Sequence, residues 1–322
     1  MRGWKTRTTA REKRILDAAL RKFPPNNAEG VVGFDIGPRI RAGLETRSTT
    51  LRVYVEHKSP RARAAPTLAV MDGGRRRVLH TDVIATGERP RASAGSARPF
   101  SGLHQGAAIV VASKRYGGVG VLVGVGGEPV AFVTAGHLFR AGAVRTTVEA
   151  ARSGGEAKTI GFLTTNLLDE LVGEQEFPID AALVRLTDAG KAMARATHNG
   201  RAPRPGALLD PDAAERVQAF RPTTHDYSVT SDVVLAPSIA HFRAPARPDG
   251  YSVREVVRTA QHVTKSGDSG TLFVAASADR SALGTCIGGD ERSSFIEPLV
   301  RSLALFCEAT GEDLRIWNGE RP

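Results

Sequence analysis

Short apolar runs recur along the sequence from residue 107 to residue 289, and glycine-rich or polar turns separate them. The runs are filled by apolar residues and threonine, most of which are good strand formers. Helical patterns do not alternate with the runs, which excludes a parallel sheet built from strand–helix–strand units. This part of the chain is therefore expected to be all-β, as a meander or Greek key. The predicted strands are 107–113, 119–125, 130–135, 159–165, 182–186, 216–220, 227–236, 251–260, 271–277 and 282–289.

Changes in composition divide the chain into four predicted segments. A stretch rich in Pro, Gly, Ser, Ala and Arg separates the strand-rich part from what precedes it, as a linker does. The segments are an N-terminal helix at 1–28, a small α/β module at 29–90, this linker at 91–106, and a strand-rich domain at 107–322.

Both ends of the chain carry helical signals. Near the start, Thr9 and Glu12 form a capping-box pattern, and an amphipathic run follows as far as Pro24. This helix is predicted to dock on its own domain, with binding to a partner as the alternative. Near the end, residues 299–311 are predicted to form a helix that stops at Gly311. The strands expected in the module are 31–40, 50–58 and 78–87.

Three polar residues stand at the edges of predicted strands. His137 ends an apolar run, Asp180 opens another, and Ser269 lies in Gly267-Asp268-Ser269-Gly270 just before a strand. Glycines on both sides of a serine let the backbone turn sharply and present the hydroxyl. The chain order of histidine, aspartate and serine is that of one known class of serine-protease triad.

The local motifs make the resemblance specific. Thr134-Ala135-Gly136-His137, the run from Asp180 to Leu186, and the run from Gly267 to Thr271 match the histidine, aspartate and serine motifs of chymotrypsin-like (trypsin-fold) serine proteases. The resemblance covers residues 107–310. It implies a mainly β fold of two six-stranded barrels with a C-terminal helix, preceded here by the α/β module. That module resembles the N-terminal part of a bacterial group of trypsin-like proteins.

The resemblance also implies a role for each residue. Ser269 is the expected nucleophile, His137 its general base, and Asp180 the group that orients the imidazole. By position, the backbone N–H groups of Gly267 and Ser269 form the oxyanion hole. The expected activity is that of a serine endopeptidase acting on a protein or peptide substrate.

Four residues are expected to line the pocket for the side chain that precedes the cut. The residue six before the nucleophile is not an aspartate, which does not favour Arg or Lys in the substrate. The pocket is therefore expected to take an uncharged side chain, although Lys265 keeps an acidic one open. The expected lining is Val263, Thr264, Gly288 and Gly289.

Other residues compete for the same roles. Asp188 and Asp232 are alternative acids, and His262 is an alternative base. In animal digestive relatives the aspartate before the nucleophile pairs with an N-terminus freed by cleavage. No clear activation sequence is present here, so Asp268 is expected to find another donor without a zymogen step.

The composition narrows the choice of cellular compartment and of the class of binding partner. The net charge of +10 and a pI near 10.1 favour anionic partners, but aromatic residues make up only 6% and do not interleave with the basic runs, which speaks against nucleic acid. The chain has two cysteines, no apolar run long enough to span a membrane and no secretory signal, so a cytoplasmic location is expected. No metal-site motif is present, and no cofactor is expected. The Ala-, Arg- and Gly-rich composition is typical of a GC-rich bacterial gene.

Two rival functions stay open, and a third is disfavoured. The first rival is a catalytically inactive protease fold that serves as a binding module. The second is a basic nucleic-acid-associated protein. An esterase is disfavoured because Thr271 stands where the GxSxG elbow needs glycine. A protease in the cytoplasm needs restraint, and the candidates for it are the N-terminal module, the linker and a regulatory protein partner that binds through residues 1–90.

Overall fold

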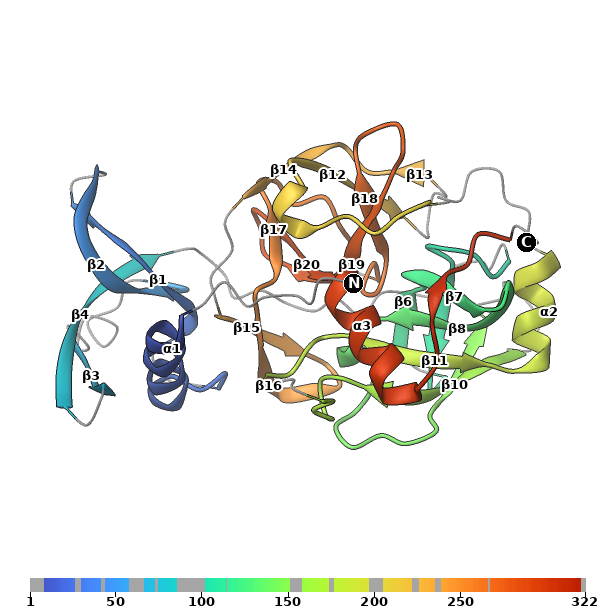
Figure 1. Ribbon diagram of the computed structural model, residues 1–322, viewed down its shortest axis with the longest axis horizontal. Coiled ribbons are helices and arrows are strands. Elements are labelled where there is room, and N and C mark those ends of the chain that lie inside the picture. Colours follow the sequence, from blue (N-terminus) through green and yellow to red (C-terminus); the bar gives the residue numbers. More distant parts are fainter. Residues whose placement is uncertain are drawn as a thin grey trace. The chain divides into compact units, whose positions relative to one another are not determined.

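The computed structural model describes residues 9–26, 30–41, 44–57, 67–72, 75–85, 102–113, 115–150, 158–173, 177–196, 205–221, 226–234, 239–265 and 267–319. The chain forms two compact units (Figure 1). Unit 1 contains residues 1–90, 236–243 and 249–256, and unit 2 contains residues 91–235, 244–248 and 257–322. Two segments of the predicted strand-rich domain therefore belong to the same unit as the N-terminal module.

The N-terminal helix of unit 1 forms as its capping pattern predicts. α1 (Ala10–Lys22) begins after Thr9, whose side chain accepts from the Glu12 N–H at 3.2 Å, while the Glu12 carboxylate accepts from the Thr9 N–H at 2.8 Å. Its apolar face is buried in the core of unit 1, through Ile15, Leu16 and Ala19. This burial favours docking on its own unit over binding to a partner.

The sheet of unit 1 combines strands from distant parts of the sequence. Its order is β16-β15-β1-β2-β4-β3, and β1 pairs antiparallel with β15 at Phe34 and Ile239. The predicted strands at 31–40, 50–58 and 78–87 correspond to β1, β2 and β4, whereas β15 was not predicted and β16 was predicted only from residue 251. The bounds are β1 (Val31–Arg41), β2 (Leu44–Val55), β3 (Thr67–Asp72), β4 (Arg75–Ala85), β15 (Ile239–Ala244) and β16 (Arg247–Arg254).

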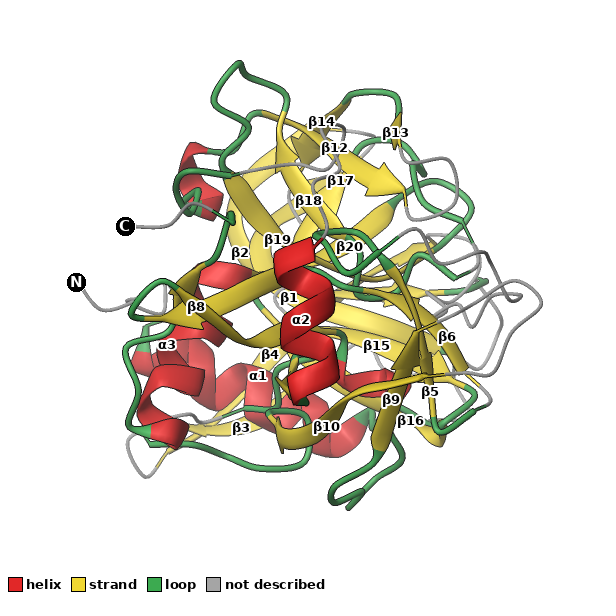
Figure 2. Cartoon of the chain, turned by 90° about the vertical axis from the view of Figure 1, so that its right-hand side faces the viewer, coloured by secondary structure: helices red, strands yellow, loops and turns green. Residues whose placement is uncertain are grey.

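The first sheet of unit 2 is a curled antiparallel sheet of eight strands in the order β21-β7-β8-β11-β10-β9-β5-β6. α2 (Asp188–Ala196) lies against it (Figure 2). The packing of α2 is close, because a Cβ at Gly190 would come within 2.1 Å of the Ile160 carbonyl oxygen. The strands are β5 (Ala108–Val111), β6 (Arg115–Gly118), β7 (Val121–Val125), β8 (Glu128–Thr134), β9 (Thr147–Ala150), β10 (Lys158–Asn166), β11 (Ala182–Leu186) and β21 (Arg315–Ile316).

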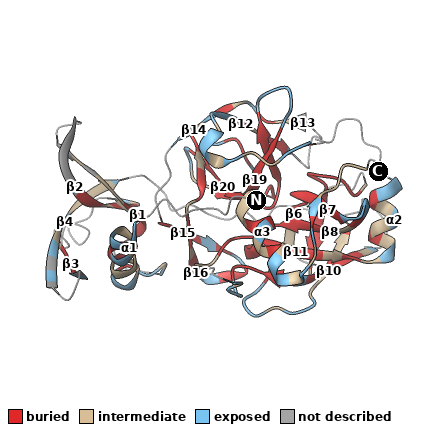
Figure 3. Cartoon of the chain, in the orientation of Figure 1, coloured by how far each residue is buried: buried red, intermediate tan, exposed pale blue. Residues whose placement is uncertain are grey.

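The second sheet of unit 2 closes on itself. Pairing runs from β12 through β14, β17, β20, β19 and β18, and a further β12–β18 pairing closes these six strands into a barrel, with β13 at its edge. Most strand residues of both sheets are buried (Figure 3). The bounds are β12 (Arg216–Arg221), β13 (Asp226–Tyr227), β14 (Ser231–Val234), β17 (Val257–Thr259), β18 (Leu272–Ala275), β19 (Ala282–Gly289) and β20 (Ser294–Pro298).

The predicted fold class is confirmed, with two differences in detail. Unit 2 is mainly β, with two curled sheets and a C-terminal helix, α3 (Leu299–Thr310), which ends at Gly311 with φ 68°. The first sheet has eight strands rather than six because β6 and β21 extend its edges. The predicted strand 251–260 is two strands, β16 in the sheet of unit 1 and β17 in the barrel.

The predicted linker is described only at its end. Residues 91–101 lie outside the described residues, as do residues 1–8 of the N-terminal segment. Leu103, His104 and Gln105 are buried, and the Gln105 side chain donates to the Trp317 carbonyl oxygen at 2.8 Å. These residues are thus part of the packed unit. Among the described helices, none has the length and apolar character needed to cross a bilayer.

Candidate active site

Strand pairing brings His137 and Asp180 together. β8 and β11 pair antiparallel, and Thr134 at the end of β8 faces Ala182 at the start of β11. His137 follows β8 in the short helix η2 (Gly136–Leu138), and Asp180 immediately precedes β11. Both residues therefore emerge at the same end of the strand pair.

Both carboxylate oxygens of Asp180 hold His137. Oδ1 accepts from the His137 backbone N–H at 2.8 Å, and Oδ2 lies 2.8 Å from the ring atom Nδ1. Asp180 is fully buried and His137 is 2% exposed. A carboxylate at Nδ1 keeps the proton of a neutral imidazole on that nitrogen, so Nε2 is left as an acceptor.

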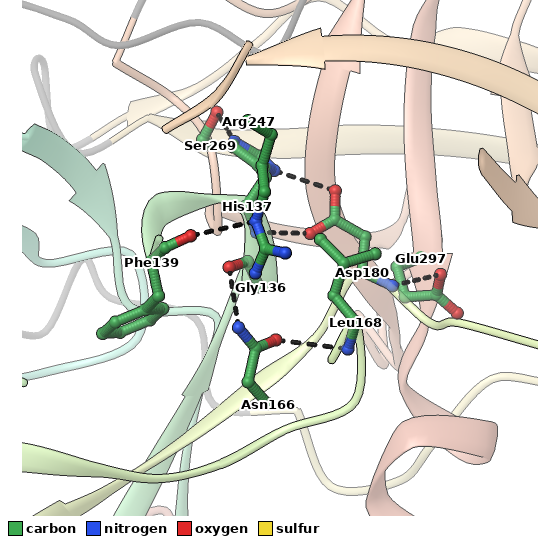
Figure 4. A network of polar contacts seen from close by, with 9 residues as sticks. All are labelled: Gly136, His137, Phe139, Asn166, Leu168, Asp180, Arg247, Ser269 and Glu297. Carbon is green, nitrogen blue, oxygen red and sulfur yellow. Dashed lines mark hydrogen bonds and ion pairs between the residues drawn. The ribbon is translucent and has the colours of Figure 1, made fainter. Parts of the chain in front are cut away.

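Ser269 reaches His137 from the second sheet of unit 2. It lies in the turn before β18, and its Oγ is 2.9 Å from His137 Nε2 (Figure 4). The turn is anchored to the first sheet, because the Gly118 N–H donates to the Ser269 carbonyl oxygen at 2.7 Å. The three residues expected from the motifs thus form one hydrogen-bonded chain across the two sheets.

Glycine is required where this turn meets the first sheet. Gly270 has φ 84°, and a Cβ there would lie 2.2 Å from Thr134 Oγ1 and 2.5 Å from the Gly118 carbonyl oxygen. Thr134 Oγ1 itself donates to that carbonyl oxygen at 2.8 Å. The threonine of the histidine motif and the glycine of the serine motif therefore pack against each other, and this contact sets the separation of the two loops.

The backbone around Asp268 follows the expected sharp turn. Gly267 has φ 96°, the Asp268 N–H donates to the Lys265 carbonyl oxygen at 3.0 Å, and the Gly270 N–H donates to the Cys286 carbonyl oxygen at 2.7 Å. The N–H groups of Asp268 and Gly270 are thus already hydrogen-bonded. They alternate along the chain with the N–H groups of Gly267 and Ser269, which are expected to form the oxyanion hole. Asp268 is fully buried, and its Oδ2 accepts from the Lys265 N–H at 2.7 Å. Lys265 thus supplies a donor to Asp268.

The residues expected to line the pocket lie on two adjoining segments. Val263 and Thr264 are buried, and both contact Ser294: the Val263 N–H donates to its Oγ at 3.1 Å, and the Thr264 hydroxyl lies 2.8 Å from it. Gly288, with φ 144°, and Gly289 end β19. Ser294 was missed because a lone serine on a strand carries no sequence signal.

The alternative acids and the alternative base are exposed and have other partners than Asp180 and His137. Asp188 is solvent-exposed, 3.9 Å from Lys191, and Asp232 is exposed beside Arg216 at 3.6 Å. His262 is exposed, with Nδ1 3.2 Å from the Ser293 carbonyl oxygen. A Cβ at Gly289 would come within 2.6 Å of the His262 ring, so the imidazole occupies the space beside this expected lining residue.

A second buried carboxylate, Glu297, lies beside Asp180. The Asp180 N–H donates to Glu297 Oε2 at 3.4 Å, and Arg301 donates to Oε1 at 2.5 Å. Burial raises the pKa of Glu297 to about 7; Arg301 opposes this shift and the charge of Asp180 adds to it. Sequence reasoning missed Glu297, because a charged residue on a strand is usually interpreted as solvent-exposed.

Glu297→Gln is expected to make stability less dependent on pH. The folded-state pKa of Glu297 is raised from 4.5 to about 7, so the folded protein binds the proton more tightly than the unfolded chain. The wild type should therefore lose about 3 kcal/mol of unfolding free energy as the pH rises from 4.5 through 7, and the glutamine variant should not. Urea unfolding at pH 5 and pH 8 measures this difference.

Glu312→Gln is the control, because Arg185 holds the pKa of Glu312 below its ordinary value. Equal pH dependence in Glu297→Gln and wild type would contradict the expectation.

No family model and no curated protein matches the chain. Among solved structures, it is similar to a glutamic-acid-specific serine protease with 21% sequence identity and a TM-score of 0.45, over 67% of this chain and 100% of that one. It is also similar to a human pathogenic astrovirus serine protease, with 13% identity and a TM-score of 0.35, over 65% and 94%. A third is the active form of a protease from M. tuberculosis, with 15% identity and a TM-score of 0.35, over 74% and 99%. All three are described as proteases, the class of protein that the sequence motifs resemble.

Proposed function

We propose that the protein is a serine endopeptidase that hydrolyses peptide bonds through Ser269, His137 and Asp180. The observation that carries the proposal is the continuous hydrogen-bonded chain from Ser269 Oγ through the imidazole to Asp180 Oδ2, with separations of 2.9 and 2.8 Å. These are the separations that proton transfer between a nucleophile and its base requires.

In the first half of the reaction, His137 Nε2 takes the Ser269 hydroxyl proton while Oγ attacks the carbonyl carbon of the substrate. The carbonyl oxygen becomes an oxyanion, which the N–H groups of Gly267 and Ser269 stabilise. The tetrahedral intermediate collapses, and His137 gives its proton to the departing amine. An ester between Ser269 and the substrate acyl group is left.

In the second half, water hydrolyses this ester. His137 takes a proton from the water, whose oxygen attacks the ester carbonyl, and then returns a proton to Ser269 Oγ as the acid product leaves. Asp180 stays ionised throughout and stabilises the imidazolium that forms in each half. The enzyme needs no cofactor for either half of this reaction.

We further propose that the preferred residue before the cut is uncharged. The lining expected from Val263, Thr264, Gly288 and Gly289 contains no charged side chain, and the Thr264 hydroxyl is already hydrogen-bonded to Ser294. A charged group held against these four residues would lose water without gaining a partner from them, which is costly. An acidic side chain is the alternative, because the His262 ring lies beside Gly289 and Lys265 adjoins Thr264.

We propose a cytoplasmic location and regulation by a protein partner through residues 1–90. Both cysteines, Cys286 and Cys307, are free thiols, which suits a reducing compartment. The sheet of unit 1 includes residues 239–243 and 249–254 in addition to the N-terminal strands. A partner bound to this sheet would therefore act on the same continuous segment of chain that joins β14 to β17.

One observation favours a second candidate function, a binding module without catalysis. Ser269 is fully buried and His137 is only 2% exposed, so a substrate reaches Oγ only after neighbouring chain is displaced. A fold that stays closed in this way would bind partners through other surfaces.

A fluorophosphonate probe distinguishes the two candidates. We expect the wild type to be phosphonylated at Ser269, as located by mass spectrometry of its peptides, and Ser269→Ala to remain unlabelled. The matched control is Ser302→Ala, which removes a buried hydroxyl from α3 that bonds to two backbone oxygens, at 3.1 and 3.5 Å. Labelling of Ser302→Ala but not of Ser269→Ala supports the protease. A folded wild type that does not react over the pH range 6–9 would favour the binding module.

A further inference from the structure

The turn that carries His137 is held at both ends by polar side chains from other parts of unit 2. Before the histidine, the Gly136 carbonyl oxygen accepts from Asn166 Nδ2 at 3.2 Å. After it, the Phe139 carbonyl oxygen accepts from Arg247 Nε at 3.1 Å (Figure 4). Neither side chain touches the imidazole through these bonds; each fixes the backbone on one side of it.

Asp169 joins the two holding groups into one network. Its carboxylate accepts hydrogen bonds from both terminal nitrogens of Arg247, at 2.5 and 2.7 Å. Its Oδ2 also accepts a hydrogen bond from Asn166 Nδ2 at 3.1 Å. The Arg247 side chain is 9% exposed and that of Asp169 is 16% exposed, so water competes little for these bonds. The network runs without a break from Gly136 through Asn166, Asp169 and Arg247 to Phe139.

Close packing leaves the turn little freedom to shift. A Cβ at Gly136 would lie 2.5 Å from Asn166 Oδ1, and that oxygen also accepts from the Leu168 N–H at 3.2 Å. Asn166 is therefore fixed by its own loop as well as by the turn. Arg247 uses all three guanidinium nitrogens at once, and a lysine cannot reproduce this planar fork.

Asp169 lies in a region rich in positive charge. Burial lowers the pKa of the Arg115 guanidinium, and the charges of Arg140 and Arg247 lower it further. Without Asp169, Arg247 would be a nearly buried cation among other cations. The carboxylate therefore helps to keep Arg247 in place beside Phe139.

We propose that Arg247 is a positioning residue for the proposed hydrolysis: with Asp169 and Asn166 it fixes the turn Gly136–Leu138, so that His137 Nε2 stays within hydrogen-bond reach of Ser269 Oγ. The inference rests on the proposed function, since the atoms held in register are those of the proposed base and nucleophile. Arg247 belongs to the hairpin of β15 and β16, which the chain inserts between β14 and β17 of the barrel. No motif of the sequence points to it.

The test compares two arginines of the same strand in the full-length protein. Arg247→Met removes the three bonds to Phe139 and Asp169. Arg254→Met is the matched control, because Arg254 is also on β16, is 7% exposed and bonds to Asp17 at 2.6 Å in unit 1. We expect phosphonylation of Ser269 to slow by about 100-fold in Arg247→Met, the effect of a displacement near 1 Å, and to keep the wild-type rate in Arg254→Met. Arg247→Lys should fall between them.

A second readout does not depend on activity. NMR of the His137 imidazole, followed through its pH titration, should differ from wild type in Arg247→Met and match it in Arg254→Met. Asp169→Asn, which keeps the shape of the side chain, should show a smaller change of the same kind and replaces Arg247→Met if that variant does not fold. A wild type that never labels overturns the proposed function, and the NMR comparison then decides the positioning role alone. Equal labelling rates and equal imidazole signals in the two methionine variants would overturn the role of Arg247.

Discussion

His137→Ala is expected to lower the rate of peptide hydrolysis by about a million-fold. Without the imidazole, Ser269 Oγ loses the base that takes its proton, and the departing amine loses the acid that protonates it. The measurement is the initial rate of peptide cleavage at saturating substrate, with circular dichroism to show that the fold is retained.

The double variant His137→Ala/Ser269→Ala makes this expectation sharper. Residues that act as one unit are not additive, so the double variant should be as slow as either single variant. An additional loss of several orders of magnitude in the double variant would mean that the two residues act independently. A His137→Ala variant with near wild-type activity would contradict the assignment of the base, and His262→Ala would then be the next variant to measure.

Asp180→Asn is expected to lower the rate by about 10,000-fold. In the wild type both oxygens of Asp180 accept, one from the His137 backbone N–H and one from the ring atom Nδ1. An asparagine has only one accepting oxygen, so its NH₂ group faces either the backbone donor or the ring. If it faces the ring, the imidazole takes the wrong tautomer and Nε2 carries the proton.

The controls for this variant are the two aspartates that sequence reasoning left as alternatives. Asp188→Asn and Asp232→Asn change only exposed pairs with Lys191 and Arg216, and exposed pairs contribute little. Both should keep wild-type activity in the same peptide assay. A large loss in either of them, together with a small loss in Asp180→Asn, would reassign the acid.

The three separated residues of the site were predictable because each is embedded in a local pattern. The residues around His137, Asp180 and Ser269 match motifs over several consecutive positions, and the structure brings the three side chains into one chain of hydrogen bonds. The contact between Gly270 and Thr134 explains why parts of two motifs are needed together. The local sequence was sufficient to predict these residues, because the backbone geometry near each of them accepts few residue types.

The course of the chain between β14 and β17 was not predictable in the same way. The alternating run 251–260 was predicted as one strand, but Glu255 has φ 53°, and the chain leaves the sheet of unit 1 there and enters the barrel. An alternation of apolar and polar residues indicates that a segment is extended and half-buried. It does not indicate which sheet the segment joins. The pairing of β15 with β1 depends on contacts between residues about 200 positions apart.

The supporting polar residues were missed for a related reason. Asn166, Asp169, Arg247 and Glu297 belong to residue types that usually face solvent. In the structure each is bonded to a partner that is distant in sequence or to the backbone of a loop, and no spacing rule links them. Only the folded chain shows that the first three hold the turn of His137 and that Glu297 accepts from the Asp180 backbone N–H.

The most direct test of the account is to map new termini by mass spectrometry after the purified protein is incubated with a peptide library. The account predicts that wild type generates new N-termini, mostly after uncharged residues, and that Ser269→Ala generates none. The same new termini at the same rate with Ser269→Ala, or none with a folded wild type whose Ser269 has reacted with the probe, would contradict it.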